Sequence, residues 1–324
     1  MSVPEDDLWA FETRPIGEER WSSREDLFKA HGYNFRPRLR NGWTPSWHTT
    51  GKSPLHSEDG EVLRVFSHRI SCLRFHLTTV QSHLTDAYTD DDKLVCIKRV
   101  ARNSEEARII QFLNTPELRE DPRNRAVPLI EMFDDPDDDT ISYIVMPFLR
   151  NADDPDFQYV KEIIDFVDQI LEVSYRSHES SSLISFYRVW CFCTRKGWHI
   201  GMVWGHVLAI EFSPSLDSDC VLHNFLMDSG AMYPEGFHPV QTAYRRDYSG
   251  IADYVPRSAV GVKYYFGDFG ISGQIPDETR PWLVIGDSGR DQEPPQLSKT
   301  VPYDPFKLDI FIIGNMLRQE FCDV

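Results

Sequence analysis

The stretch LVCIKRV at residues 94–100 is followed closely by NSEEARIIQFLN at residues 103–114, and the change of pattern between them indicates the fold class. The β-branched first stretch is typical of a strand that ends in Lys98. In the second stretch Ser104 is a good N-cap, and apolar residues recur on one helical face. The pattern therefore predicts a strand followed by an amphipathic helix that ends before Pro116.

Further apolar runs along the chain predict the remaining strands and helices. Two apolar runs, Val127–Phe133 and Ile141–Phe148, predict strands joined by the acidic loop DDPDDD. Residues 158–173 predict an amphipathic helix, and its apolar stripe consists of Val160, Ile163, Ile164, Val167, Ile170 and Leu171. Residues 306–318 predict a second helix, and Val262–Gly270 predicts a strand that ends in an Asp-Phe-Gly turn. The order strand, helix, two strands, helix lacks regular βαβ alternation, so we expect an α+β fold.

Composition narrows the class of protein. The 324 residues allow one large or two modest domains, and the net charge of −17 disfavours nucleic acid or an anionic membrane as partner. The N-terminus lacks a signal-peptide pattern and no apolar run reaches the length of a membrane span, so we expect an intracellular protein, cytoplasmic or nuclear. Cys191 and Cys193 have no second pair, which makes zinc a poor interpretation.

Five polar residues follow one another in an order that suits phosphoryl transfer from ATP. A Lys at a strand end holds phosphates and is positioned by a Glu on the next helix. An Asn and an Asp on loops hold Mg²⁺, and a second Asp orients the attacking hydroxyl. The candidates, in order, are Lys98, Glu106, Asp219, Asn224 and Asp268.

With these residues in place, the chain resembles the protein kinase superfamily, in a kinase-like branch abundant in mushroom-forming fungi. The resemblance covers roughly residues 86–173 and 219–322. It is carried by LVCIKRV, DPRNRAVPLIEMF, SYIVMPFLR, NFLMDSGAMYPEGFHPV, YYFGDFGIS and PYDPFKLDIFIIGNMLRQEF. It implies a bilobal fold: an N-terminal extension over 1–60, an N-lobe sheet with its C-helix over 61–149, and a truncated, mainly helical C-lobe over 150–324.

The resemblance also implies roles. Lys98 would bind phosphate and pair with Glu106, with Glu105 as the nearby alternative. Met146 would guard the adenine pocket, with Phe148 in the hinge. Asp219 would be the catalytic base, and Asn224 and Asp268 the ligands of Mg²⁺. The implied activity is ATP-dependent phosphorylation of Ser or Thr hydroxyls on an unknown protein substrate.

The pattern departs from the family in three places. Asp217-Ser218-Asp219 stands where His-Arg-Asp is expected, after a Ser- and aromatic-rich stretch at 174–216 that we interpret as an atypical insertion. Residues 64–88 contain no glycine, so a glycine-rich phosphate loop is unsupported. Gln296 stands where a closing Glu is common, and the chain ends just after the helix that carries Asp309. Two alternatives therefore stay open: an inactive pseudokinase-like scaffold or fragment, and a small-molecule kinase of the aminoglycoside-phosphotransferase type.

Overall fold

The computed structural model describes residues 9–60, 83–122, 124–172, 187–189, 203–205, 221–270, 272, 283–287 and 291–321. It is an α+β structure with antiparallel sheets and several helices, as the sequence predicts. The chain divides into two compact units. Unit 1 comprises Met1–Val100, Ile130–Phe148 and Gly230–Val260, and unit 2 comprises Ala101–Leu129, Leu149–Ser229 and Gly261–Val324.

Unit 1 is built on a five-stranded sheet with the strand order β1-β2-β3-β5-β4. Its strands are β1 (Tyr33–Asn34), β2 (Leu84–Thr89), β3 (Leu94–Ala101), β4 (Glu131–Asp134) and β5 (Ile141–Pro147). The β2–β3 hairpin aligns Leu84 with Lys98 and Asp86 with Cys96. The acidic loop that follows Glu131–Asp134 closes the β4–β5 hairpin, where the sequence predicts it.

One face of this sheet is covered by the N-terminal residues of unit 1. Val95 and Ile97 of β3 and Tyr143 of β5 are buried in one apolar cluster with Trp21 and Phe28. The rings pack edge to face, with the Phe28 and Tyr143 centroids 4.8 Å apart, which is a favourable aromatic geometry. Because strand residues alternate between faces, Cys96, Lys98 and the other alternate residues of β3 lie on the opposite face.

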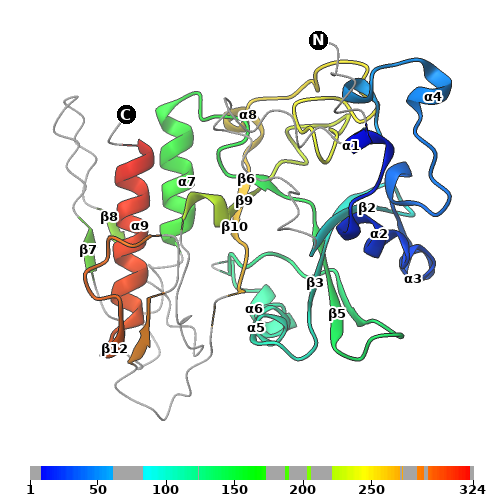
Figure 1. Cartoon of the computed structure of the whole chain (residues 1–324). Helices are drawn as coiled ribbons and strands as arrows, with labels where there is room; N and C mark the ends of the chain where they lie inside the picture. Colours follow the sequence, from blue (N-terminus) through cyan, green and yellow to red (C-terminus); the bar gives the residue numbers. More distant parts are fainter. Residues whose placement is uncertain are drawn as a thin grey trace. The chain divides into compact units, whose positions relative to one another are not determined.

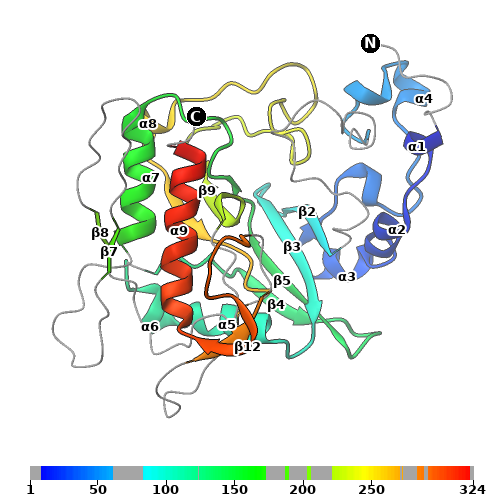
Figure 2. The ribbon, with the colours of Figure 1, turned by 60° about the vertical axis from the view of Figure 1, so that its left-hand side comes forward.

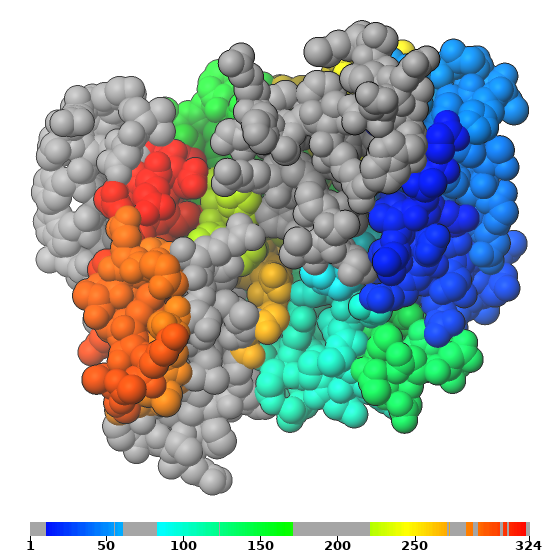
Figure 3. All heavy atoms as spheres, in the orientation of Figure 1, coloured from blue at the N-terminus to red at the C-terminus, as the bar shows by residue number. Residues whose placement is uncertain are grey.

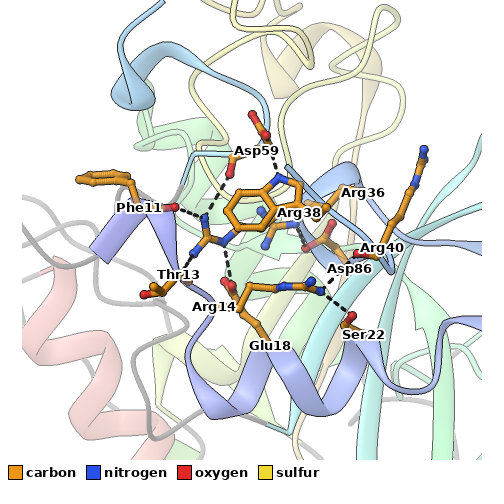
Figure 4. Close-up of polar contacts among 11 residues, drawn as sticks. Phe11, Thr13, Arg14, Glu18, Ser22, Arg36, Arg38, Arg40, Asp59 and Asp86 are labelled. Atoms are coloured by element: carbon orange, nitrogen blue, oxygen red, sulfur yellow. Dashed lines mark hydrogen bonds and ion pairs between the residues drawn. The ribbon is translucent and has the colours of Figure 1, made fainter. Parts of the chain in front are cut away.

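Residues 9–60 form short helices held together by one buried arginine. The helices are α1 (Trp9–Glu12), α2 (Ile16–Ser22), α3 (Glu25–Ala30), the 3-10 turn Pro37–Leu39, α4 (Trp47–Thr50) and the 3-10 turn Pro54–His56. Arg38 is fully buried, and its guanidinium donates to Glu18 Oε2 at 2.7 Å and to the backbone oxygens of Phe11, Thr13 and Asp59 (Figure 4). This network explains why residues 9–60 pack together although their sequence shows little helical or strand periodicity. The atoms of these residues form one continuous surface, coloured blue in Figure 3.

Unit 2 contains a three-stranded antiparallel sheet against a pair of helices. The strands, in sheet order, are β10 (Lys263–Phe266), β9 (Phe225–Asp228) and β6 (Arg150–Asn151). The helices α7 (Val160–Glu172) and α9 (Pro305–Phe321) lie side by side in Figures 1 and 2. Phe166 of α7 joins these elements, because its ring contacts Phe225, Tyr264 and Phe321.

The remaining elements of unit 2 are short. They are α5 (Glu105–Leu113), α6 (Pro116–Arg119), the antiparallel pair β7 (Tyr187–Val189) and β8 (Val203–Gly205), the 3-10 turn Leu222–Asn224, and the pair β11 (Val284–Gly286) and β12 (Ser298–Tyr303). Ser104 caps α5 as predicted, since its Oγ accepts a hydrogen bond from the Ala107 amide at 3.3 Å. Within the predicted insertion at 174–216, only β7 and β8 belong to the described residues.

Two expectations from the sequence differ from the structure. The predicted strand over Val127–Phe133 begins only at Glu131, because Pro128 has no amide hydrogen for a ladder. In α7 the predicted apolar stripe includes Val160 and Ile164, but these side chains are 54% and 49% exposed. Ile170 of the predicted stripe is buried as expected, and Phe166, which lies outside that stripe, is buried as well.

Residues 230–260, called the connecting loop here, join β9 to β10. These two strands belong to unit 2, whereas the residues of the loop belong to unit 1. It contains the short helix α8 (Arg257–Val260), and Met232, Tyr233, Phe237 and His238 are buried. In the described part of the chain, no helix combines the length and the apolar character that crossing a membrane demands.

Candidate functional site

The phosphate-binding candidate Lys98 lies on β3, on the sheet face opposite the core cluster of unit 1. Leu84 is its direct partner on β2, and Cys96 lies two residues away on the same face. Burial and the nearby Asp86 carboxylate raise the pKa of the Cys96 thiol to about 12, so this thiol stays protonated at neutral pH. The sequence predicts that the strand ends at Lys98-Arg99, whereas β3 continues to Ala101, so Lys98 lies inside the strand.

The hinge candidates lie at the end of β5, which is the neighbour of β3 in the same sheet. Met146 is the sixth residue of β5, and alternation places it on the face of Lys98, because Tyr143 and Val145 point into the core cluster. The Phe148 amide donates to the Leu94 oxygen at 3.2 Å, which ties the residues after β5 to the start of β3. Lys98, Met146 and Phe148 thus belong to one unit, with Lys98 and Met146 on strands of one sheet and Phe148 just after β5.

The metal-binding candidates Asn224 and Asp268 come together in unit 2. The β9–β10 ladder aligns Phe225 with Phe266, so the residues just outside it also face each other. The Gly267 amide donates to the Asn224 oxygen at 2.9 Å, and Asp268 is the next residue. Two residues far apart in the sequence are therefore held at the same end of one hairpin.

The backbone around Asp268 is fixed from both sides. Phe266 exchanges hydrogen bonds with the segment Arg125–Val127 on the side opposite β9. Asp268 itself has the positive φ of 58°, uncommon outside glycine, and its Oδ1 accepts from the Gly270 amide at 3.1 Å. Such sparsely populated conformations cluster at functional sites.

Glu106 lies near this turn. A Cβ built on Gly270 would meet both Asp268 Oδ1 and Glu106 Oε2 within 4 Å. Phe269, the residue between Asp268 and Gly270, packs against Ile109 and Leu113 on α5, the helix that carries Glu106. The structure therefore brings Glu106, Asn224 and Asp268 together in unit 2. Lys98 belongs to unit 1, so its pairing with Glu106 stays a prediction.

The donors at the β9–β10 end suit a magnesium ion. Mg²⁺ prefers oxygen ligands and is usually held by one or two carboxylates together with waters and substrate phosphates. Asp268 supplies an exposed carboxylate and Asn224 an amide oxygen, which fits that need. Over the described residues, no group of three or more His, Cys, Asp or Glu side chains could hold a metal ion by itself.

Asp219, the predicted base, and its competitor Asp217 lie outside the described residues. Sequence analysis missed Phe269, which packs beside the site, and Glu293, which accepts hydrogen bonds from α9. Phe269 gave no separate signal because a single aromatic in a turn is common, and its contact with α5 needs the fold. Glu293 was also missed: it accepts hydrogen bonds from Asn315, Arg318 and Gln319 of α9, three residues before Gln296, where a closing Glu was sought.

Comparisons of the chain with models of protein families, with curated proteins and with solved structures found no match.

Proposed function

We propose that this chain is a kinase-like, ATP-dependent phosphotransferase that acts on Ser or Thr hydroxyls of protein substrates. One observation carries the proposal: the β9–β10 hairpin holds Asn224 and Asp268 at one end, beside Glu106. A pair of oxygen ligands next to a helix glutamate is the arrangement that phosphoryl transfer with Mg²⁺ uses. The antiparallel sheet of unit 1 and the helices of unit 2 would be the two lobes of a kinase fold.

In this proposal each described residue has a separate task. Lys98 binds the phosphates on its face of the sheet, next to Met146, which borders the adenine. Asn224 and Asp268 hold Mg²⁺, which when bound neutralises the charge that develops on the transferred phosphoryl group. Asp219 orients the substrate hydroxyl and accepts its proton.

A second candidate is a nucleotide-binding scaffold that does not catalyse transfer. It is favoured by Asp217-Ser218 in front of Asp219, because neither residue can pack the catalytic loop as His-Arg does in the family that this chain resembles. The two candidates share the nucleotide site and differ only in turnover.

A transfer assay with radiolabelled Mg–ATP distinguishes the phosphotransferase from the scaffold. It measures phosphate transfer to a basic test protein and to the chain itself. Wild type should transfer phosphate, and Asp219→Asn should lower the rate at least about 100-fold, the usual contribution of a positioned base. Asp217→Asn is the matched control and should keep the rate. Loss of turnover in Asp217→Asn alone would reassign the base, and a wild type that binds ATP without turnover would favour the scaffold.

A further inference from the structure

The connecting loop contacts the rest of unit 1 at three points. His238 Nε2 lies 3.0 Å from the backbone oxygen of Glu58, and because Nδ1 accepts from two amides, Nε2 carries the proton and donates it. The Phe237 ring packs on Phe148, with centroids 5.8 Å apart. Arg246 lies over the ring of Tyr88 at 3.6 Å, and its Nη1 donates to both Asp92 oxygens at 2.7 and 2.9 Å.

The Arg246 contact lies on the Lys98 face of the sheet. Tyr88 and Asp86 alternate with Ala87, which belongs to the core cluster on the other face. Leu84, which is opposite Lys98, therefore shares its face with Asp86 and Tyr88. The connecting loop thus covers the part of this face near the β2–β3 turn.

The covered state buries polar atoms without partners. In the described part of the chain, Asp86 Oδ2, Tyr88 Oη and Tyr248 Oη are buried side-chain oxygens that have no hydrogen-bond partner. The Asp86 side chain is only 4% exposed, and its other oxygen accepts from Arg36 Nε at 3.0 Å. Tyr248 lies beside His238, with ring centroids 4.7 Å apart, so the loop itself helps to bury these atoms.

Such atoms make the covered state costly. A buried group without a partner loses its hydration and gains nothing in return. Lifting the loop would hydrate these oxygens, while the Arg246 contacts oppose lifting. The unpartnered oxygens favour lifting the loop and the Arg246 contacts favour keeping it closed, so the two contributions oppose each other.

We propose that the connecting loop is a lid on the Lys98 face, latched by Arg246 on Tyr88 and Asp92, that opens to admit the nucleotide. The nucleotide part rests on the proposed function. Residues 64–88 lack glycine and therefore do not provide a glycine-rich loop over the phosphates. The lid would cover the Lys98 face in its place.

Cys96 reports on the lid without any nucleotide, because it lies on the covered face opposite Asp86. Its rate of modification by N-ethylmaleimide, read by peptide mass spectrometry, should rise about tenfold in Arg246→Gln, which corresponds to about 1.4 kcal/mol of lost latch energy. Asp92→Asn removes the charge partner of Arg246 and leaves Tyr88 in place, so it should also accelerate labelling. Arg245→Gln is the matched control, because its ion pair with Asp253 lies inside the loop. Equal Cys96 rates in wild type, Arg246→Gln and Arg245→Gln would overturn the lid.

The nucleotide arm uses a fluorescent ATP analogue with Mg²⁺. Its association rate should rise in Arg246→Gln in step with Cys96 labelling and stay unchanged in Arg245→Gln. Faster labelling with an unchanged association rate would overturn gating by the loop. A wild type that binds no nucleotide would refute the proposed function, while the labelling rates would still decide whether the loop is a lid.

Discussion

The Gly267 amide donates a 2.9 Å hydrogen bond to the Asn224 backbone oxygen, directly beyond the last pair of the β9–β10 ladder. This bond fixes the residue before Asp268 against the residue that would share its metal ion. A Cβ on Gly267 would come within 2.7 Å of Leu226 Cδ1, so a larger residue there would require the Leu226 side chain to move. The geometry of the proposed metal site is thus a property of the hairpin.

The first prediction concerns Asp268. Asp268→Asn removes the only carboxylate of the proposed pair, so we expect nucleotide binding to lose its dependence on Mg²⁺. Asp228→Asn is the control, since Asp228 is an exposed carboxylate at the other end of the β9–β10 pair, opposite Lys263. Isothermal titration of ATP with and without Mg²⁺ measures the difference. An unchanged magnesium dependence in Asp268→Asn would contradict the site.

The second prediction concerns the buried arginine of the N-terminal residues. Arg38→Met leaves Glu18 and three backbone oxygens without their donor, so we expect the free energy of unfolding to fall by about 3 kcal/mol or more. Arg108→Met, at an exposed helix ion pair with Glu105, should change it by less than about 0.5 kcal/mol. Urea denaturation measures both. Similar losses in the two variants would show that the Arg38 network does not hold these residues together.

The third prediction is a dependence of stability on pH. Burial, with a further contribution from Arg36, lowers the pKa of His238 to about 4, while the Glu58 oxygen and the Asp86 carboxylate act in the opposite direction. The imidazole of the unfolded chain has the ordinary pKa of 6.5 and binds a proton below that pH, while the folded one does not, so stability should fall as the pH drops from 6.5 towards 4. The loss from His238 should reach about 3 kcal/mol near pH 4.

His238→Asn tests this dependence, because its amide oxygen can still accept from the Val240 and Gln241 amides but does not titrate in this range. The difference in unfolding free energy between the variant and wild type should shrink as the pH is lowered. A difference that stays constant from pH 7 to pH 4.5 would mean that His238 is not buried as a neutral ring.

Local signals predicted the elements that depend on local chemistry. Ser104 and the apolar spacing after it predicted α5, and the acidic loop predicted the β4–β5 hairpin. The α+β class followed from those elements. Val160 and Ile164 were placed in the wrong face of α7 because the helix packs through Phe166 on strands that are distant in sequence.

The candidate site was predictable only as a set of residues. The order of Glu106, Asn224 and Asp268 in the sequence indicated shared chemistry. The β9–β10 ladder brings Asn224 and Asp268 to one end, and Glu106 lies near Asp268 at Gly270. The connecting loop was not predicted, since nothing near Arg246 in the sequence indicates that it packs on Tyr88. Contacts of this kind join residues far apart in the chain and leave no periodic trace.

The proposed role of Lys98 in a nucleotide site is tested most directly by the thermal stabilisation of the chain by Mg–ATP. At an ATP concentration 100 times the Kd, wild type should gain about 2.7 kcal/mol of stability. Lys98→Ala should lose this gain, whereas Lys93→Ala should keep it, because Lys93 is an exposed lysine on the same hairpin, paired with Asp91. A wild type that Mg–ATP does not stabilise, or equal gains in wild type and Lys98→Ala, would contradict the account.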